Sequence, residues 1–423
     1  MSIQDATDSS VAPRDQTPNR AAAGGIGGTR RHTPTGRTPF LDLRTGLLGA
    51  AGFLVAISWQ VVLPVLPLHL SRIGYSDAQI GVLVSFLSLA MGIAELEVGR
   101  VAGMLGQRWA LVGGLLANTV AMVWMAVARI WGTVGGALSS IGAARAMMWS
   151  PLQAAVADAA SEETRGRTFG VFWFLTSLGF LAGPAIGGVV AAHYGDRAVF
   201  YLGAAISLAT LPVVFAITTP ARPTLRLTAS AAGEVLRDRV VFRICLANHL
   251  HYAITGVWST FLPLYAVTQG LTVLTVGEVF AIQGLAYALV QIPTGRLADR
   301  WGPERLVVPA LVGRAVISLL VPVFHTVPVF LVAGAFYGLA GGFVPVTFAT
   351  LVARRVSREH YTTAMGVYNS SGDLGFFVGP LLGGAAALLG ILAPFYLCVP
   401  LGVAAIITGL RVVAAVEQPP QAV

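Results

Sequence analysis

Long apolar runs with short polar punctuation are the feature that most constrains this chain. Each run is about 20 residues long, enough for a helix to cross a hydrocarbon core of about 30 Å. We count twelve, at roughly 46–69, 78–98, 109–128, 131–157, 168–192, 198–217, 244–267, 275–294, 306–324, 328–352, 362–388 and 392–412. With 55% hydrophobic and 11% charged residues, the composition also lies outside that of ordinary soluble domains. The sequence therefore predicts an all-α membrane protein with 12 transmembrane helices, surrounded by the lipid bilayer.

The placement of arginine predicts the orientation of the chain. All 27 basic residues are arginines, and they gather before the first run, between the sixth and seventh, and in alternate loops. The opposite loops hold only Arg72, Arg129 and Arg197. Since cytoplasmic loops carry an excess of basic residues, we expect a multi-pass protein of the cytoplasmic membrane with both termini cytoplasmic. The net charge of +8 is then explained by topology, and no nucleic acid partner is expected.

The chain repeats itself at an offset of 196 residues. GVFWFLTSLGFLAGPAIGG at 170–188 has the same glycine and proline frame as GVYNSSGDLGFFVGPLLGG at 366–384, and GRVAGMLG at 99–106 matches GRLADRWG at 295–302. Such an offset predicts two parallel six-helix repeats, an architecture of transporters with a substrate site near the bilayer midplane. The alternative is a membrane scaffold with an old duplication. The predicted parts are a disordered cytoplasmic tail (1–44), an N-terminal half (45–217), a cytoplasmic linker (218–243), a C-terminal half (244–413) and a cytoplasmic tail (414–423).

Two of these motifs resemble those of the major facilitator superfamily, and the resemblance covers the chain after residue 44. The loop signature of that family is similar to Gly295, Arg296, Leu297, Ala298, Asp299, Arg300 and Gly302. The frame at 170–188 resembles the signature of the 12-helix drug:proton antiporter group. The resemblance implies the major facilitator fold and points towards efflux.

Glycines four residues apart share one stripe of a helix and let a neighbouring helix approach closely. Prolines within such stripes bend the helix. We expect close packing, at the interface between the halves, from Gly179, Gly183, Pro184, Gly187, Gly375, Gly379, Pro380 and Gly383. The alternative is tight helix packing without any role in gating.

Charges in the cytoplasmic loops are candidates for a gate. By resemblance, a loop aspartate and nearby arginines form a cytoplasmic gate that breaks when the transporter opens inward. The candidates are Arg100, Arg108, Asp158, Arg165, Arg167, Asp299, Arg300 and Arg354. The first half departs from the family pattern, because Gly103 stands at the position equivalent to Asp299.

Ionisable residues within the apolar runs are costly and therefore mark functional sites. Asp373 lies eleven residues into its run, about 16 Å deep, and its repeat partner is Ser177. We expect Asp373 to bind a proton or a cationic substrate group; the alternative is a structural partner for a buried arginine. Glu95, expected close to the cytoplasmic surface, is a second proton-site candidate, and Arg145 is a candidate partner of Asp373 or of an anionic substrate.

Aromatic and amide side chains in several runs are candidates for a cavity that accepts an amphipathic organic molecule; for each residue, helix packing is the alternative. They are Trp59, Gln60, Trp149, Trp173, His251, Thr255, Trp258, Gln283, Tyr287, Gln291, Tyr337, Tyr368 and Asn369. Arg314 receives no assignment.

These observations predict a proton-coupled secondary active transporter that exports small amphipathic compounds or drugs by alternating access. The alternative on the same fold is an importer or uniporter of a polar nutrient. An integral membrane enzyme is disfavoured because no His-rich cluster or nucleophile motif is present, and no phosphate-binding loop indicates ATP. Neither metal nor cofactor is expected, and Cys245 and Cys398 show no disulfide pattern. The expected partners are the bilayer, a small-molecule substrate and protons, and a monomer is expected.

Overall fold

The structure is a computed structural model that describes residues 43–159, 165–217, 229–356 and 360–417. Most of the predicted N-terminal tail, the first part of the linker (218–228) and the last six residues lie outside the described residues. The residues from Leu41 to Val423 belong to one compact unit.

Every regular element in the described ranges is helical, which confirms the all-α prediction. In chain order they are α1 (Leu43–Gln60), α2 (Leu66–Arg72), α3 (Asp77–Leu105), α4 (Gln107–Val127), α5 (Trp131–Ala159), α6 (Arg165–Tyr194), α7 (Asp196–Ala216), α8 (Ala229–Arg237), α9 (Arg239–Thr268), α10 (Val273–Trp301), α11 (Glu304–Leu319), the 3-10 turn η1 (Val321–Val323), α12 (Val327–Arg355), α13 (Tyr361–Ala387) and α14 (Ala393–Glu417). Seven are long and apolar enough to cross a membrane, namely α3, α4, α6, α7, α10, α12 and α14. Twelve spans remain a prediction.

The first predicted run is divided, whereas its repeat is not. Helix α1 ends at Gln60, and a turn leads to α2, so residues 46–69 do not form one helix as predicted. Helix α9, the repeat of this segment, continues through Pro263. The first copy carries a second proline, Pro64, where the second copy has Thr260. Each proline removes one backbone donor from a helix, and two within four residues are sufficient reason for the break.

The two predicted loops at 99–106 and 295–302 are helical almost to their ends. Helix α3 continues to Leu105 and α10 to Trp301. The helices stop where Gly106 and Gly302 adopt φ values of 88° and 86°, a left-handed conformation that glycine tolerates best. The prediction placed the helix ends too early, because the charged residues of these segments extend the helix instead of breaking it.

The repeat is visible in matched details of the backbone. Ser76 and Thr272 are 196 residues apart, and each caps the following helix by accepting a hydrogen bond from the backbone N–H three residues later. Such caps typically contribute about 1 kcal/mol. The duplicated sequence therefore builds duplicated local structure.

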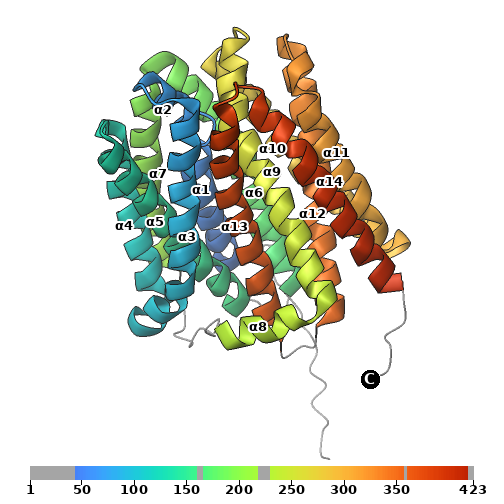
Figure 1. Cartoon of the computed structure of the whole chain (residues 1–423). Coiled ribbons are helices and arrows are strands. Elements are labelled where there is room, and N and C mark those ends of the chain that lie inside the picture. Colours follow the sequence, from blue (N-terminus) through green and yellow to red (C-terminus); the bar gives the residue numbers. More distant parts are fainter. Residues whose placement is uncertain (1–42, 160–164, 218–228, 357–359, 418–423) are drawn as a thin grey trace, which may run out of the picture. The chain divides into compact units, whose positions relative to one another are not determined.

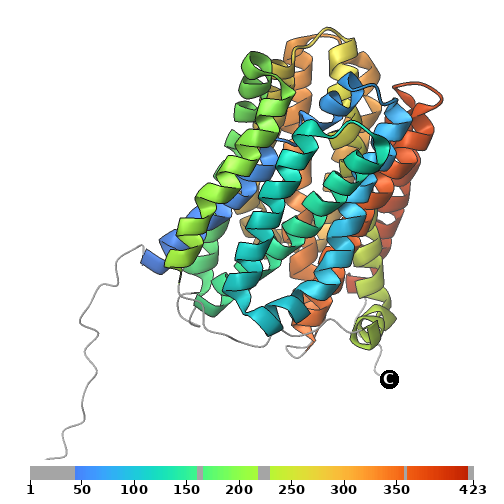
Figure 2. The same ribbon diagram turned by 90° about the vertical axis from the view of Figure 1, so that its left-hand side faces the viewer.

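We call α1–α7 the N-terminal set and α9–α14 the C-terminal set. Across the two sets, α3 packs against α13 and α6 packs against α10. Figure 1 shows α2 at one end of the helices and α8 at the other, which we call the α2 end and the α8 end. Figure 2 shows the long helices running side by side between these ends.

Glycine pairs bring the two sets together near the α2 end. A Cβ added to Gly81 would lie 2.7 Å from the Cα of Gly384, and one added to Gly277 would lie 2.9 Å from the Cα of Gly188. The two pairs are equivalent in the repeat, because Gly277 lies 196 residues after Gly81 and Gly384 lies 196 residues after Gly188. Because backbone meets backbone at both places, neither contact has room for a side chain.

The predicted glycine stripes pack closely, but not where we expected them. Gly179 and Gly183 of α6 lie against α1, and Gly375 and Gly379 of α13 lie against α9, so each stripe is internal to one set. For these four glycines the expected place at the interface between halves is wrong, whereas the carbonyls of Pro184 and Pro380 do face Gly277 and Gly81 of the opposite set. The outer glycine of each motif, Gly188 or Gly384, makes that interface instead, because it projects from a different side of the helix.

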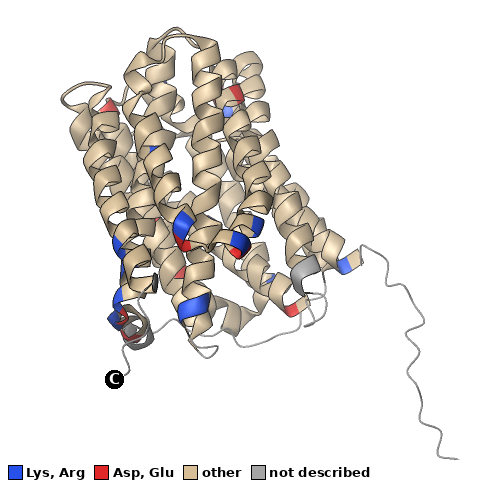
Figure 3. Cartoon of the chain, turned by 90° about the vertical axis from the view of Figure 1, so that its right-hand side faces the viewer, with Lys and Arg blue, Asp and Glu red and all other residues tan. Residues whose placement is uncertain are grey.

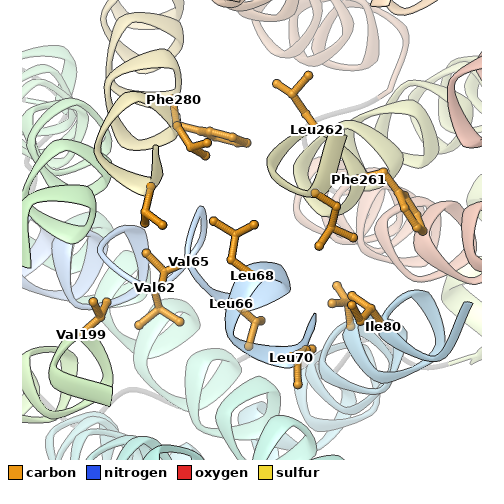
Figure 4. Packing of buried hydrophobic residues seen from close by; sticks show 14 of the residues in the cluster. Val62, Val65, Leu66, Leu68, Leu70, Ile80, Val199, Phe261, Leu262 and Phe280 are labelled. Carbon is orange, nitrogen blue, oxygen red and sulfur yellow. The ribbon is translucent and has the colours of Figure 1, made fainter. Parts of the chain in front are cut away.

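A buried apolar cluster joins the two sets at the α2 end. Residues after the break in α1 meet side chains of α9 and α10. Figure 4 shows Val65 and Leu68 directed towards Phe280 and Leu262. Since lipid is as apolar as these side chains, the contact is stabilised mainly by close van der Waals packing. The turn created by Pro64 thus supplies part of the contact between the sets.

Candidate functional site

Two carboxyl groups from different sets meet in the middle of the helices. Glu95 on α3 and Asp373 on α13 share a side-chain hydrogen bond. Ionised carboxylates only accept hydrogen bonds, so this contact requires a proton on one of the two groups. The pair is therefore a candidate site for one proton between the N-terminal and C-terminal sets.

Arg145 on α5 completes this cluster. Its guanidinium lies within electrostatic range of both carboxyl groups, and its Cζ lies 4.2 Å from the ring centroid of Trp59 on α1. A cation over a desolvated tryptophan ring gains about 2 kcal/mol. With one shared proton the carboxyl pair carries one negative charge, which Arg145 balances.

Glu95 lies deeper than we predicted from the sequence. It precedes the end of α3 at Leu105 by ten residues, or about 15 Å at 1.5 Å per residue. Asp373 follows the start of α13 at Tyr361 by twelve residues, or about 18 Å. The sequence placed Glu95 nearer to the cytoplasmic surface than Asp373, whereas the structure brings the two side chains together.

A second cluster surrounds Arg314 on α11, which is only 3% exposed. Its Nη2 donates to the hydroxyls of Thr255 and, at 2.8 Å, of Tyr337. The ring of Tyr337 stacks on Trp258 with centroids 3.8 Å apart, and the indole N–H of Trp258 donates to Gln283 at 2.9 Å. Four candidate cavity residues, Thr255, Trp258, Gln283 and Tyr337, thus form one cluster with Arg314.

Tyr252 on α9 lies between the two clusters. It is within electrostatic range of both Asp373 and Arg314, and its ring lies beside Gly372. The sequence analysis did not name Tyr252, and it assigned no role to Arg314. The available signal was that Tyr252 adjoins His251 on a helix rich in polar residues, and that an arginine in an apolar run had no acidic neighbour.

The remaining cavity candidates are dispersed. Trp149 and Trp173 form a separate aromatic group with Phe172, with Trp149 and Trp173 centroids 5.8 Å apart. Gln60 packs against Gly183, and Asn369 is exposed. His251 is buried beside Tyr252, and Tyr287 hydrogen-bonds with Gln291 near Arg314, while Tyr368 is buried in the helix packing. Their binding roles remain predictions.

The described contacts of three gate candidates lie within the N-terminal set. Arg100 pairs with Glu97 one turn away at 3.6 Å, Arg108 donates to the carbonyl of Ile217, and Asp158 accepts from Gln107 at 3.1 Å. These contacts stay within the N-terminal set. Asp299, Arg300 and Arg354 are exposed. The side chains of Arg165 and Arg167 are not among those that the structure describes. The gate remains a prediction.

One ion pair at the α8 end was not predicted. Arg355, the neighbour of the candidate Arg354, donates to Asp238 at 2.8 Å. Asp238 also caps α9 by accepting from the backbone N–H groups of Val240 and Val241. Burial raises the pKa of Asp238, but these hydrogen bonds and the charge of Arg355 outweigh it and hold the pKa below its usual value.

No group of three or more His, Cys, Asp or Glu side chains in the described residues could hold a metal ion. The candidate site thus consists of a carboxyl pair, half-buried Arg145, buried Arg314 and aromatic side chains.

Comparison with known proteins decides the family. The model of the Major Facilitator Superfamily matches residues 48–282 and 244–423. The chain belongs to this superfamily. This major facilitator protein is 25% identical over 349 residues to a multidrug resistance efflux pump PmrA homolog of Lactococcus lactis, covering 79% of this chain and 86% of the relative. It is 26% identical over 368 residues to the multidrug resistance protein MdtG of Salmonella paratyphi A, covering 83% of this chain and 90% of the relative.

The fold of this major facilitator protein is also that of solved structures. The crystal structure of the nucleoside transporter NupG matches with a TM-score of 0.74 and 13% sequence identity, covering 89% of this chain and 100% of NupG. At that identity the match shows the fold alone. The protein is therefore a membrane transporter of the major facilitator type, related in sequence to multidrug efflux proteins.

Proposed function

We propose that this protein exports small amphipathic organic compounds across the cytoplasmic membrane in exchange for protons. The observation that supports this most directly is the hydrogen bond between Glu95 and Asp373. It holds one proton at the contact between the two sets, where relative motion of the sets would change its access to either side of the membrane.

Alternating access is supported by the uneven packing of the helices that join the sets. Near the α2 end, Gly81 and Gly277 meet backbone atoms of the opposite set. Towards the α8 end of the same helices, a Cβ on Gly92 or Gly295 would meet no atom within 4 Å. We infer that the structure represents a state closed at the α2 end and parted at the α8 end, with the two six-helix halves moving against each other.

The direction of the chain follows from its charges. Figure 3 shows most of the ribbon coloured for acidic and basic residues towards the α8 end. Because cytoplasmic loops carry an excess of basic residues, we assign the α8 end to the cytoplasm. The closed α2 end then faces outwards, so the parted end would accept compounds from the cell interior.

The substrate class is supported by the aromatic lining and by the relatives. Trp258 and Tyr337 stack on each other in the C-terminal set, and half-buried Gln283 accepts a hydrogen bond from Trp258. Two sequence relatives are named as multidrug resistance proteins. A mostly aromatic site with few polar groups suits compounds that differ in shape but share an apolar body.

Proton movement coupled to substrate tests this function. Purified protein is reconstituted in vesicles with an internal pH dye, and lipophilic cations, anions and neutral drugs are added in turn. Export by exchange predicts that an outward substrate gradient drives protons in the opposite direction. Proton movement in the same direction as substrate would identify an importer by symport, and substrate flux without proton movement would identify a uniporter.

A further inference from the structure

Arg314 is a buried guanidinium without an acidic partner. In the described chain, the groups within electrostatic range of it are His251, Tyr252, Tyr287, Tyr337 and Cys398, none of them a carboxylate. Its Nε is buried and has no hydrogen-bond partner. An unbalanced charge in the membrane interior is costly, so its presence calls for an explanation.

The offset of 196 residues relates its surroundings to those of Arg145. Thr255 is the repeat partner of Trp59, and Gly341 is the repeat partner of Arg145 itself. Arg314 donates to Thr255 and lies directly against Gly341, in the space that a side chain there would take. Each set therefore holds one guanidinium in an equivalent place, supplied by α5 in the N-terminal set and by α11 in the C-terminal set.

The acidic residues around Arg145 are not repeated. The position equivalent to Glu95 is Gln291, and the position equivalent to Asp373 is Ser177. Arg145 thus has two carboxyl groups in range, whereas the matching positions around Arg314 are neutral. The C-terminal set keeps the cation of this arrangement and lacks its anions.

Helix packing alone does not require this charge. The repeat partner of Arg314 is Asn118 on α4, which donates to Ser207 at 2.8 Å and to Ser58 at 3.4 Å. A neutral amide with two hydroxyl partners therefore fills the equivalent position in the N-terminal set. A guanidinium at this place is a departure from the repeat, as Asp373 is.

We propose that Arg314 binds an acidic group of the transported molecule, in the place that the carboxyl groups take beside Arg145. The ligand class is an aromatic or amphipathic compound with a carboxylate, phosphonate or sulfonate, which pairs well with a guanidinium. Half-buried Thr255 and Tyr287 lie next to Arg314, and the apolar body would lie along this half-buried side of the cluster. This inference rests on the proposed function, since it names part of that substrate site.

The expected effect is large enough to measure. Hydrogen bonds to charged groups contribute about 1.5–3 kcal/mol, which is about ten- to a hundredfold in affinity. An acidic ligand should therefore bind at least about tenfold more tightly than its neutral isostere.

Equilibrium binding to the full-length protein in lipid nanodiscs tests this. Radiolabelled 1-naphthoate is displaced by 1-naphthylphosphonate, 1-naphthalenesulfonate or the neutral 1-naphthamide at constant pH. We expect at least one anion to bind about tenfold or more tightly than the amide. If none of the three anions binds more tightly than the amide to the wild-type protein, the proposal is overturned, whatever the behaviour of any variant.

Variants then assign the preference to Arg314. Arg314→Gln should abolish the preference for the anion, measured as the ratio of the affinities for anion and amide in the same protein, while Arg314→Lys should retain part of it. Arg411→Gln removes an exposed arginine of α14 and is the matched control, with the preference kept. A folded Arg314→Gln protein that keeps the full preference would refute the assignment. Because binding is measured without a proton gradient, failure of proton coupling would not affect the result.

Discussion

Replacing Asp373 by asparagine should uncouple transport from the proton gradient while leaving the site assembled. Asparagine keeps the shape of the side chain, and its amide can donate to the Glu95 carboxylate in place of the shared proton. Glu95 is then a fixed negative charge beside Arg145, and the pair no longer gains and loses a proton. The substrate should still bind, but its movement should follow only its own gradient.

The magnitude follows from the single shared proton of the pair. One elementary charge crossing a potential of 100 mV releases about 2.3 kcal/mol, which supports a ratio of about fiftyfold for a neutral substrate at about 1.4 kcal/mol per decade. In proteoliposomes with such a potential, the wild-type protein should approach that ratio. Asp373→Asn should reach a ratio of about one while retaining exchange of labelled for unlabelled substrate.

Two further variants sharpen the assay. Glu95→Gln should behave like Asp373→Asn, because it removes the other half of the pair. Glu97→Gln is the control, since Glu97 is 61% exposed and pairs with Arg100 outside the cluster, and it should accumulate substrate as the wild type does. If Asp373→Asn accumulates substrate about fiftyfold, the carboxyl pair is not the coupling site and the reasoning is wrong.

Three other predictions concern packing and charge. Gly277→Ala should part the sets at the α2 end and raise the labelling of cysteines introduced there from the outside, while Gly92→Ala, with open space around it, should not. Trp59→Leu should lower the free energy of unfolding by about 2 kcal/mol, because it removes the cation–π contact with the guanidinium of Arg145. Arg355→Gln should destabilise the protein by at most about 1 kcal/mol, because the pair is half-exposed. As the folded pKa of Asp238 is lowered, that contribution is present above about pH 4 and is lost as the pH falls through the folded pKa, which unfolding measured against pH in both proteins will show.

The sequence predicted the helical membrane architecture because apolar length and glycine spacing are local signals. The sequence analysis missed the break after Gln60, although Pro64 marks it. A proline within an apolar run does not always end a helix, because α9 continues through Pro263. The sequence analysis also ended two helices too early, before Leu105 of α3 and Trp301 of α10. Charged residues there favour a loop by composition, but they are also compatible with a helix that leaves the apolar layer.

The functional site was predictable by residue but not by arrangement. Asp373 was identified because its repeat partner is neutral, and the structure places it beside Glu95. The role proposed for Arg314 could not be inferred from its position in the sequence, because it depends on contacts with Gly341 and Thr255 on two other helices. Contacts among helices α9, α11 and α12 are long-range, and no periodicity within one helix encodes them.

The two glycine pairs near the α2 end have a consequence for how such a chain diversifies. Gly81 with Gly384 and Gly188 with Gly277 are one contact written twice, as would occur between two identical six-helix chains. In such an ancestral pair, one codon change would alter both contacts at once. Once the genes were fused, each glycine became a separate locus, so the closure on one side could be adjusted while the other was inherited unchanged. The same independence allowed an aspartate and an arginine to arise in a single copy.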